Sequence, residues 1–269
     1  MKKILCLCLA FVLAACCGCA GAEAKHPYGV FLSINENIAQ FADYETVVID
    51  AQYFPAEEIE AFRNEGHKVL TYLNIGSLED FRDYYDEYKD ITLGAYEHWE
   101  EESWMDVSQP RWQDKILKDI VPGLLEKHVD GFFVDNCDVY YVYPREEILE
   151  GLSVLMKGLV ATGKLVVING GDTFLDAYCE KLGTWNDVIT GISQESVFSS
   201  INWDDETFGT AEAEDHEYFM DYVNRYGEQG VDIFLLEYTT DEELIRTVDA
   251  FCADHGYLYY VSDSIELDG

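Results

Sequence analysis

DGFFVDNCD, residues 130–138, is a short apolar run that stops abruptly on acids and an amide, and this pattern recurs along the chain. Strands buried on both faces are continuous apolar runs, and most of these runs are separated by helical patterns, so they predict a parallel sheet of βα units. The runs cover 29–33, 46–50, 68–74, 131–135, 164–169, 188–195, 231–237 and 257–262. Eight such units predict a closed (β/α)8 TIM barrel of the α/β class.

The polar residues at the ends of these runs are the first indication of a functional site. In a (β/α)8 barrel, the carboxyl ends of the strands form one face of the fold, and that face carries the active site. Six strand-end side chains are therefore expected to converge on one pocket: Asp50, Asn74, Asp135, Asn169, Glu195 and Glu237.

The connections between the runs support a single domain over residues 28–269. Apolar residues recur at helical spacing within 148–159, 219–226 and 244–252, and each stripe ends close to a glycine. In the last of these, Thr240 and the acids that follow it form a predicted capping box. Residues 75–130 are longer than one loop and helix require, which predicts an insertion between the third and fourth strands. Trp112 in that segment heads an amphipathic helix and is expected to pack against the barrel.

The first residues predict export. Residues 1–15 combine Lys2 and Lys3 with an apolar stretch shorter than the roughly 20 residues of a membrane span, as in a signal peptide. Leu13-Ala14-Ala15-Cys16 resembles a bacterial lipobox, so Cys16 is the predicted lipidation site and residues 16–27 the tether. We therefore expect a domain that is lipid-anchored at the bacterial cell envelope.

Composition narrows the class of partner. The formal net charge of −36 repels nucleic acid and anionic lipid and favours cationic partners. Of the eight cysteines, Cys137, Cys179 and Cys252 fall in the folded part, and their spacing is not that of a zinc site. The sequence therefore predicts no cofactor and no metal.

Carboxylates at strand ends suit glycosidic bond cleavage, which needs one carboxylic acid and one carboxylate. Strands two positions apart around a barrel can bring such groups together, and Asp135 and Glu195 have that relation. Asp50, Asp138 and Glu237 compete for these roles. A metal-dependent hydrolase with Asp50, Asp135 and Asp138 as oxygen ligands is an alternative from another class.

Several motifs carry a resemblance to a known family. They are Val48-Ile49-Asp50, the segment 69–77 with Phe81-Arg82, Trp104-Met105-Asp106-Val107, the segment 130–138 and Glu237-Tyr238. Together, and in this order, the chain resembles glycoside hydrolase family 114, the endo-α-1,4-polygalactosaminidase-like barrels. The segment Ser193-Gln194-Glu195-Ser196 departs from the family's usual Asn-Glu-Glu/Gln-Cys at the sixth strand.

The resemblance implies cleavage of a polysaccharide that contains α-1,4-linked galactosamine and is cationic where amines are free. It implies Asp135 and Glu195 as the catalytic pair, and the surroundings of the two residues favour Glu195 as the acid and Asp135 as the ionised partner. The residues expected to contact the sugar are Asp50, Tyr72, Asn74, Asn136, Asp138, Asn169, Glu237 and Tyr238. A surface lipoprotein that binds amino-sugar polymers without cutting them is the other hypothesis, because it needs the same residues.

Overall fold

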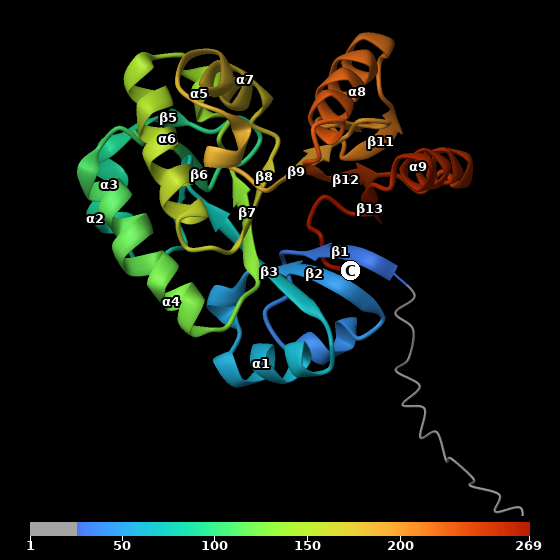
Figure 1. The fold of residues 1–269 in the computed structure, drawn as a ribbon, viewed down its shortest axis with the longest axis horizontal. Coiled ribbons are helices and arrows are strands. Elements are labelled where there is room, and N and C mark those ends of the chain that lie inside the picture. The colour runs from blue at the N-terminus through green and yellow to red at the C-terminus, as the bar shows by residue number, and fades with distance from the viewer. Residues whose placement is uncertain (1–25) are drawn as a thin grey trace, which may run out of the picture.

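The computed structural model describes residues 26–269, and its centre is a parallel sheet (Figure 1). Each pair of neighbouring strands in this sheet is parallel. In spatial order, the strands are β1 (His26–Phe31), β2 (Tyr44–Ile49), β3 (Lys68–Asn74), β7 (Gly131–Asp135), β8 (Leu165–Asn169), β9 (Gly191–Glu195), β12 (Asp232–Tyr238) and β13 (Leu258–Ser262). The eight predicted strands are therefore present and in chain order.

The sheet curls into a nearly closed barrel. β1 and β13, at the two ends of the strand order, lie against each other, and the rings of Phe31 and Tyr260 meet edge to face with centroids 5.3 Å apart. Burial on both faces explains the continuous apolar runs, since Val47, Val48 and Ile49 of β2 all have no exposed surface. The predicted (β/α)8 architecture is confirmed.

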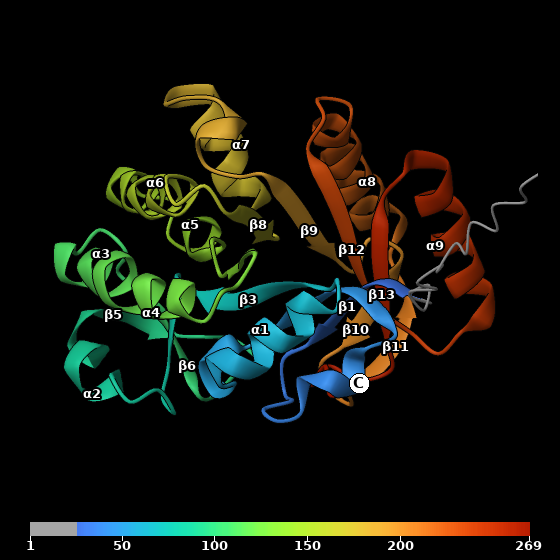
Figure 2. The ribbon, with the colours of Figure 1, turned by 60° about the horizontal axis from the view of Figure 1, so that its bottom comes forward.

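Helices cover the outside of the strands (Figure 2). They are α1 (Ala56–Asn64), α3 (Pro110–Lys115), which continues through a π-helical turn (Ile116–Ile120) into α4 (Val121–Glu126), then α5 (Val139–Val142), α6 (Glu146–Val160), α7 (Asp172–Lys181), α8 (Ala213–Gly227) and α9 (Glu242–His255). The cap of α9 differs from the prediction. Asp241, and not Thr240, is the N-cap, because its carboxylate accepts a hydrogen bond from the backbone amide of Glu243 at 2.8 Å.

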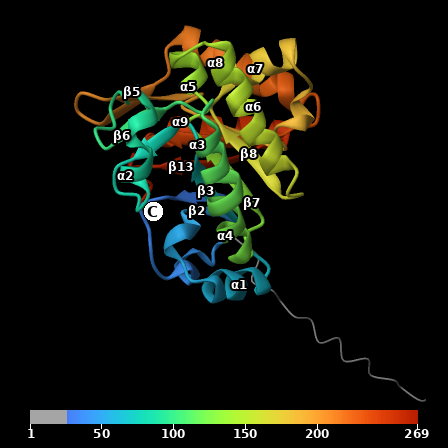
Figure 3. The same cartoon turned by 90° about the vertical axis from the view of Figure 1, so that its left-hand side faces the viewer.

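The long connection between β3 and β7 forms a small layer of its own (Figure 3). It contains an antiparallel sheet of β4 (Ser77–Glu79), β6 (Glu102–Met105) and β5 (Thr92–Ala95), together with α2 (Tyr85–Tyr88). Trp112 of α3 is completely buried, and its indole nitrogen donates to the Ile75 carbonyl at 2.8 Å. Trp112 thus anchors the crossover to the barrel, as predicted.

Two strands begin three residues from the predicted position, and the other strand bounds lie within two residues of the prediction. β1 begins at His26, inside the segment 16–27 assigned to the tether, and ends at Phe31. β9 begins at Gly191 and not at residue 188, because a 3-10 turn over Trp185–Asp187 delays the extended backbone. The β1–β2 connection carries a 3-10 turn (Ile38–Phe41) in place of a full helix. The predicted signal peptide (1–15) and Cys16 lie outside the described residues.

A β-hairpin follows β9 and is formed by β10 (Ser199–Asn202) and β11 (Thr207–Thr210). It projects at the carboxyl end of the barrel, ahead of α8.

Within residues 26–269, no helix combines the length and the apolar character that crossing a bilayer would demand.

Candidate active site

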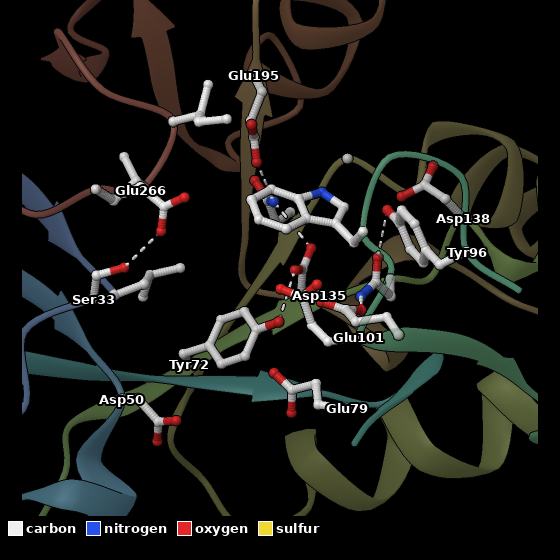
Figure 4. A pocket seen from close by; sticks show the side chains of 18 of the residues that line it. Ser33, Asp50, Tyr72, Glu79, Tyr96, Glu101, Asp135, Asp138, Glu195 and Glu266 are labelled. Atoms are coloured by element: carbon white, nitrogen blue, oxygen red, sulfur yellow. Dashed lines mark hydrogen bonds between the residues drawn. The ribbon is translucent and has the colours of Figure 1, made fainter. Parts of the chain in front are cut away.

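The carboxyl ends of the strands surround a pocket of about 670 Å³ (Figure 4). Asp135 ends β7, Asn169 ends β8, Glu195 ends β9 and Tyr238 ends β12, and all four side chains line this pocket. Tyr72 of β3 lines it from the side. The convergence expected from the strand ends is therefore present for Asp135, Asn169 and Glu195.

One amide nitrogen joins the two acids. Asn169 Nδ2 donates to Asp135 Oδ1 at 3.0 Å and to Glu195 Oε1 at 2.6 Å. These two carboxyl oxygens are therefore separated by at most the sum of the two distances, about 5.6 Å. Carboxyl groups ~5 to 5.5 Å apart are typical of retaining glycosidases, whereas inverting enzymes place them ~6.5 to 9.5 Å apart.

Each acid also accepts a hydrogen bond from a buried tyrosine. Tyr72 donates to Asp135 Oδ2 at 3.1 Å, and Tyr238 donates to Glu195 Oε2 at 2.8 Å. Burial raises the pKa of both phenols well above the ordinary value, so both keep their protons and act as donors. The orientation of both carboxyl groups is thus fixed from two sides.

The electrostatic environment raises the pKa of both acids. For Asp135 the cause is burial, and the hydrogen bonds from Asn169 and Tyr72 oppose it. For Glu195 the pKa is raised by burial and, to a smaller extent, by the charge of Asp135, against the hydrogen bonds from Asn169 and Tyr238. When Asp135 is ionised, Glu195 therefore holds its proton more tightly, as a general acid must.

The backbone turns sharply after each acid. Asn136, which follows Asp135, has φ 66°, and Ser196, which follows Glu195, has φ 54°. Non-glycine residues in this left-handed region are uncommon and concentrate at functional sites. The chain thus leaves the barrel immediately after presenting each carboxyl group.

A network of side chains supports the pocket wall beside Asp135. Asn136 Nδ2 donates to Glu102 Oε2 at 3.3 Å, and Asn136 Oδ1 accepts from the Tyr96 hydroxyl at 3.1 Å. Asn74 is buried outside the pocket and donates to the same Glu102 oxygen at 3.3 Å. Asn74, expected to contact the sugar, therefore positions Glu102. Burial raises the pKa of Glu102 to about 7.

Asp138 lines the pocket beside the loop after β8. Its Oδ1 accepts a weak hydrogen bond from the Gly171 amide at 3.3 Å. Burial, followed by the charges of Asp172 and Asp135, raises the pKa of Asp138 to about 7. Asp172 also lines the pocket. A bound cation would therefore help to ionise Asp138.

Asp50 lies at the far end of the pocket in a buried ion cluster. Arg82 Nη1 donates to Asp50 Oδ2 at 2.7 Å, and the same guanidinium makes two hydrogen bonds to Glu79. Asp50 Oδ1 accepts from the Gln52 amide at 3.0 Å. Both oxygens of Asp50 thus have protein partners, and the residue shapes the pocket wall together with Arg82.

Glu237 does not reach the pocket, although it ends a predicted strand. It is completely buried, and its carboxylate accepts hydrogen bonds from the backbone amides of Val197, Phe198 and Ser199 and from the Ser199 hydroxyl. Successive residues of a strand point to opposite faces, so Tyr238 enters the pocket and Glu237 faces the β9–β10 connection. The structure thus places Glu237, which was expected to contact the sugar, outside the pocket as a support for that loop.

Several pocket residues were absent from the sequence-based set. They come from the β3–β7 connection, the β10–β11 hairpin and the C-terminal segment, and they are Glu79, Arg82, Tyr96, Trp99, Glu101, Glu102, Trp203 and Glu266. Two signals pointed to some of them: the Phe81-Arg82 motif, and the concentration of aromatic residues among acids in 75–130. Trp203 is 39% exposed, and its ring stacks on His98 with centroids 4.9 Å apart.

The lining is strongly acidic. Among the described residues that line the pocket, the carboxyl side chains are Asp50, Glu79, Glu101, Glu102, Asp135, Asp138, Asp172, Glu195 and Glu266, against the single guanidinium of Arg82. That guanidinium is already bound to two of the acids. Within 26–269, no three His, Cys, Asp or Glu side chains converge as a metal site would require. The Asp50 carboxylate, one of the metal ligands considered from sequence, instead binds Arg82.

The family can now be assigned. The model of glycoside-hydrolase family GH114 matches residues 22–167, which is more than half of the chain and includes Asp135. The chain belongs to family GH114. It is therefore a glycosidase, and the family predicted from the motifs is confirmed. Glu195 lies beyond the matched segment.

Solved structures agree on the fold. The glycoside hydrolase domain of PelA from Pseudomonas aeruginosa has 19% identity and a TM-score of 0.77, covering 90% of this chain and 96% of that one. Ega3 of Aspergillus fumigatus, solved in complex with galactosamine, has 16% identity and a TM-score of 0.70, with coverage of 92% and 94%. An α-galactosidase from Thermus thermophilus, solved with stachyose, is more distant, with 12% identity, a TM-score of 0.54 and coverage of 90% and 62%. A search of curated proteins finds no match.

Proposed function

We propose that this protein is a retaining glycosidase that cleaves polysaccharide containing α-1,4-linked galactosamine, with Asp135 and Glu195 as its catalytic carboxyl groups. The observation that carries the proposal is that Asn169 Nδ2 binds both acids on the floor of the pocket. Membership of GH114 supplies the reaction class. The galactosamine bound to Ega3, which shares this fold, supports the choice of sugar.

The charge of the pocket supports a cationic substrate. A galactosamine residue without an acetyl group carries an ammonium at neutral pH, and nine carboxyl side chains line the pocket. Opposite charges within ~4 to 6 Å favour the ionised form of both partners. The rings of Trp99 and Trp203 at the rim offer flat faces against which a pyranose can stack.

The proposed reaction has two steps. The Asp135 carboxylate attacks the anomeric carbon while Glu195 gives its proton to the glycosidic oxygen, so the bond to the leaving sugar breaks and a glycosyl ester forms. Water then attacks the same carbon, Glu195 takes the water proton, and Asp135 is released. The tyrosine hydrogen bond and the Asn169 amide stabilise the anionic Asp135.

The activity is tested with purified protein and galactosamine-rich polysaccharide. We expect shorter oligosaccharides from the wild type and a loss of at least about a thousandfold in kcat for Asp135→Asn and Glu195→Gln. Asp232→Asn, at the exposed opposite end of β12, is the matched control and should retain activity. Polymer that binds without being shortened would contradict the proposal and favour the non-catalytic lipoprotein.

The proposed enzyme is exported and anchored by lipid at Cys16. The support lies in the sequence, where a basic start, a short apolar stretch and small residues precede Cys16. A tether of about ten residues would hold the barrel close to the membrane surface. The substrate of such an enzyme is an extracellular or envelope polymer.

A further inference from the structure

A second hollow, of about 310 Å³, adjoins the main pocket at Glu195. The residues that line it are Glu195, Ser196, Ser199, Ser200, Ile201, Trp203, Ala211, Asp215 and Phe219. Glu195, Ile201, Trp203 and Phe219 line both spaces. The two hollows are thus neighbours that share four lining residues.

The hollow is built by segments that the barrel holds in place. β10 and Ala211, which follows β11, form its wall, and Asp215 and Phe219 at the start of α8 also line it. The hydroxyl of Ser199 donates to the buried Glu237 at 2.6 Å, which fixes the base of the hairpin. The wall is therefore preformed.

The two catalytic acids differ in their access to this hollow. Asp135 lines the main pocket alone, whereas Glu195 lines both spaces. A nucleophile needs to reach the anomeric carbon of one sugar, but a general acid must reach the oxygen that joins two sugars. The glycosidic oxygen that accepts the proton joins the sugar in the main pocket to the leaving sugar, and the second hollow is the neighbouring space that Glu195 also lines.

We infer that the second hollow is the subsite for the leaving-group sugar, and that this sugar is a hexosamine with a free amine. The inference rests on the proposed function and adds the position and chemistry of the second sugar. Trp203 and Phe219 provide apolar faces, and Asp215 provides a carboxylate for an ammonium. The Ser196 hydroxyl has no hydrogen-bond partner within the part of the chain that the structure describes, so it is available to a sugar hydroxyl.

The test compares two substrates that differ in their leaving group. An α-galactosaminyl fluoride releases fluoride without a proton donor and has no leaving-group sugar. An oligogalactosamine needs a proton donor and has a leaving-group sugar. Ala211 lines the second hollow alone, so Ala211→Phe fills it, and Ala211→Ser is the matched control. We expect Ala211→Phe to lower kcat/KM for the oligosaccharide at least about tenfold and to leave fluoride hydrolysis within about threefold. Equal losses on both substrates, or no loss on either, would overturn the inference.

A second variant, Asp215→Asn, tests the negative charge of the second hollow, and its result does not depend on whether Ala211→Phe folds. Asp215 is exposed and lines the second hollow alone. Asp215→Asn should raise KM several-fold for fully deacetylated oligosaccharide and leave KM for the fluoride unchanged. A KM that is unchanged for both substrates would show that Asp215 does not bind the ammonium. A wild-type protein inactive on polymer and fluoride alike would instead contradict the proposed function.

Discussion

Asp135 and Glu195 end different strands, yet their carboxyl groups share a hydrogen-bond donor, the side-chain nitrogen of Asn169. Asn169 ends β8, the strand between theirs. The barrel therefore sets the spacing of the acids, and the amide sets their orientation and lowers the pKa of each. Its Oδ1 is buried without a hydrogen-bond partner within 26–269.

Removal of the shared donor should shift the pH dependence of catalysis. In Asn169→Ala both carboxyl groups lose a hydrogen bond that lowers their pKa, so both limbs of the kcat/KM profile should move to higher pH. We expect kcat to fall on the order of a hundredfold. The profile of Asn64→Ala, on the exposed end of α1, should match the wild type. A lower rate with unmoved limbs would show that Asn169 acts only through packing.

The two acids should respond differently to chemical rescue. In Asp135→Ala a small anion such as azide can occupy the vacated space and attack the anomeric carbon, so azide should restore turnover on the galactosaminyl fluoride and give a glycosyl azide of inverted configuration. Glu195→Ala should keep the first step on the fluoride, because this leaving group needs no proton. The anomer released by the wild type, followed by NMR, should be the α form. Release of the β anomer would contradict retention.

Lipidation of Cys16 should be visible in bacterial cells. With the native leader, the protein should incorporate labelled palmitate and fractionate with membranes, and Cys16→Ser should do neither. Cys17→Ser is the matched control, since it changes the adjacent thiol and leaves Cys16 in place. Equal labelling of both variants would place the lipid elsewhere.

The barrel and its acids were predictable from sequence because both depend on strand ends. Fully buried parallel strands give continuous apolar runs, and the residues that end these runs gather at the carboxyl end of the barrel, where the functional site lies. Asp135, Asn169 and Glu195 were found in this way. The sequence did not reveal that Asn169 joins the acids, because that contact depends on the side-by-side order β7, β8, β9 and on side-chain orientation.

The positions of other residues could not be predicted from the sequence, for physical reasons. Glu237 ends an apolar run, but the two-residue period of the strand turns it away from the pocket and Tyr238 towards it. Glu102 lies among acids that resemble a solvated surface. It reaches the pocket because β6 pairs with β4 and brings it to Ser77, whose hydroxyl donates to it. Such tertiary pairing leaves no periodic signal.

Gly76 should be intolerant of any side chain. A Cβ built there would lie 1.7 Å from the Asn136 carbonyl oxygen, so Gly76→Ala must displace the backbone next to Asp135. We expect a loss of about 3 kcal/mol or more in the free energy of unfolding, measured with urea. Gly123→Ala, in α4 with no atom within 4 Å of its Cβ, should instead gain about 0.5 to 1 kcal/mol. Equal stabilities of the two variants would contradict this close approach.

The raised carboxyl pKa values predict that the protein is more stable in mild acid than in mild base. Burial raises the pKa of Glu102 from 4.5 to about 7 and that of Asp138 from 3.8 to about 7. The unfolded chain releases these protons at the lower values, so the stability they contribute is full below about pH 4 and is lost as the pH rises to about 7. We expect Tm to fall on the order of 5 °C between about pH 5 and about pH 8. Glu102→Gln should reduce this difference, while the exposed Glu65→Gln should preserve it. A Tm that rises over this range would mean that both carboxyl groups are ionised in the folded protein throughout.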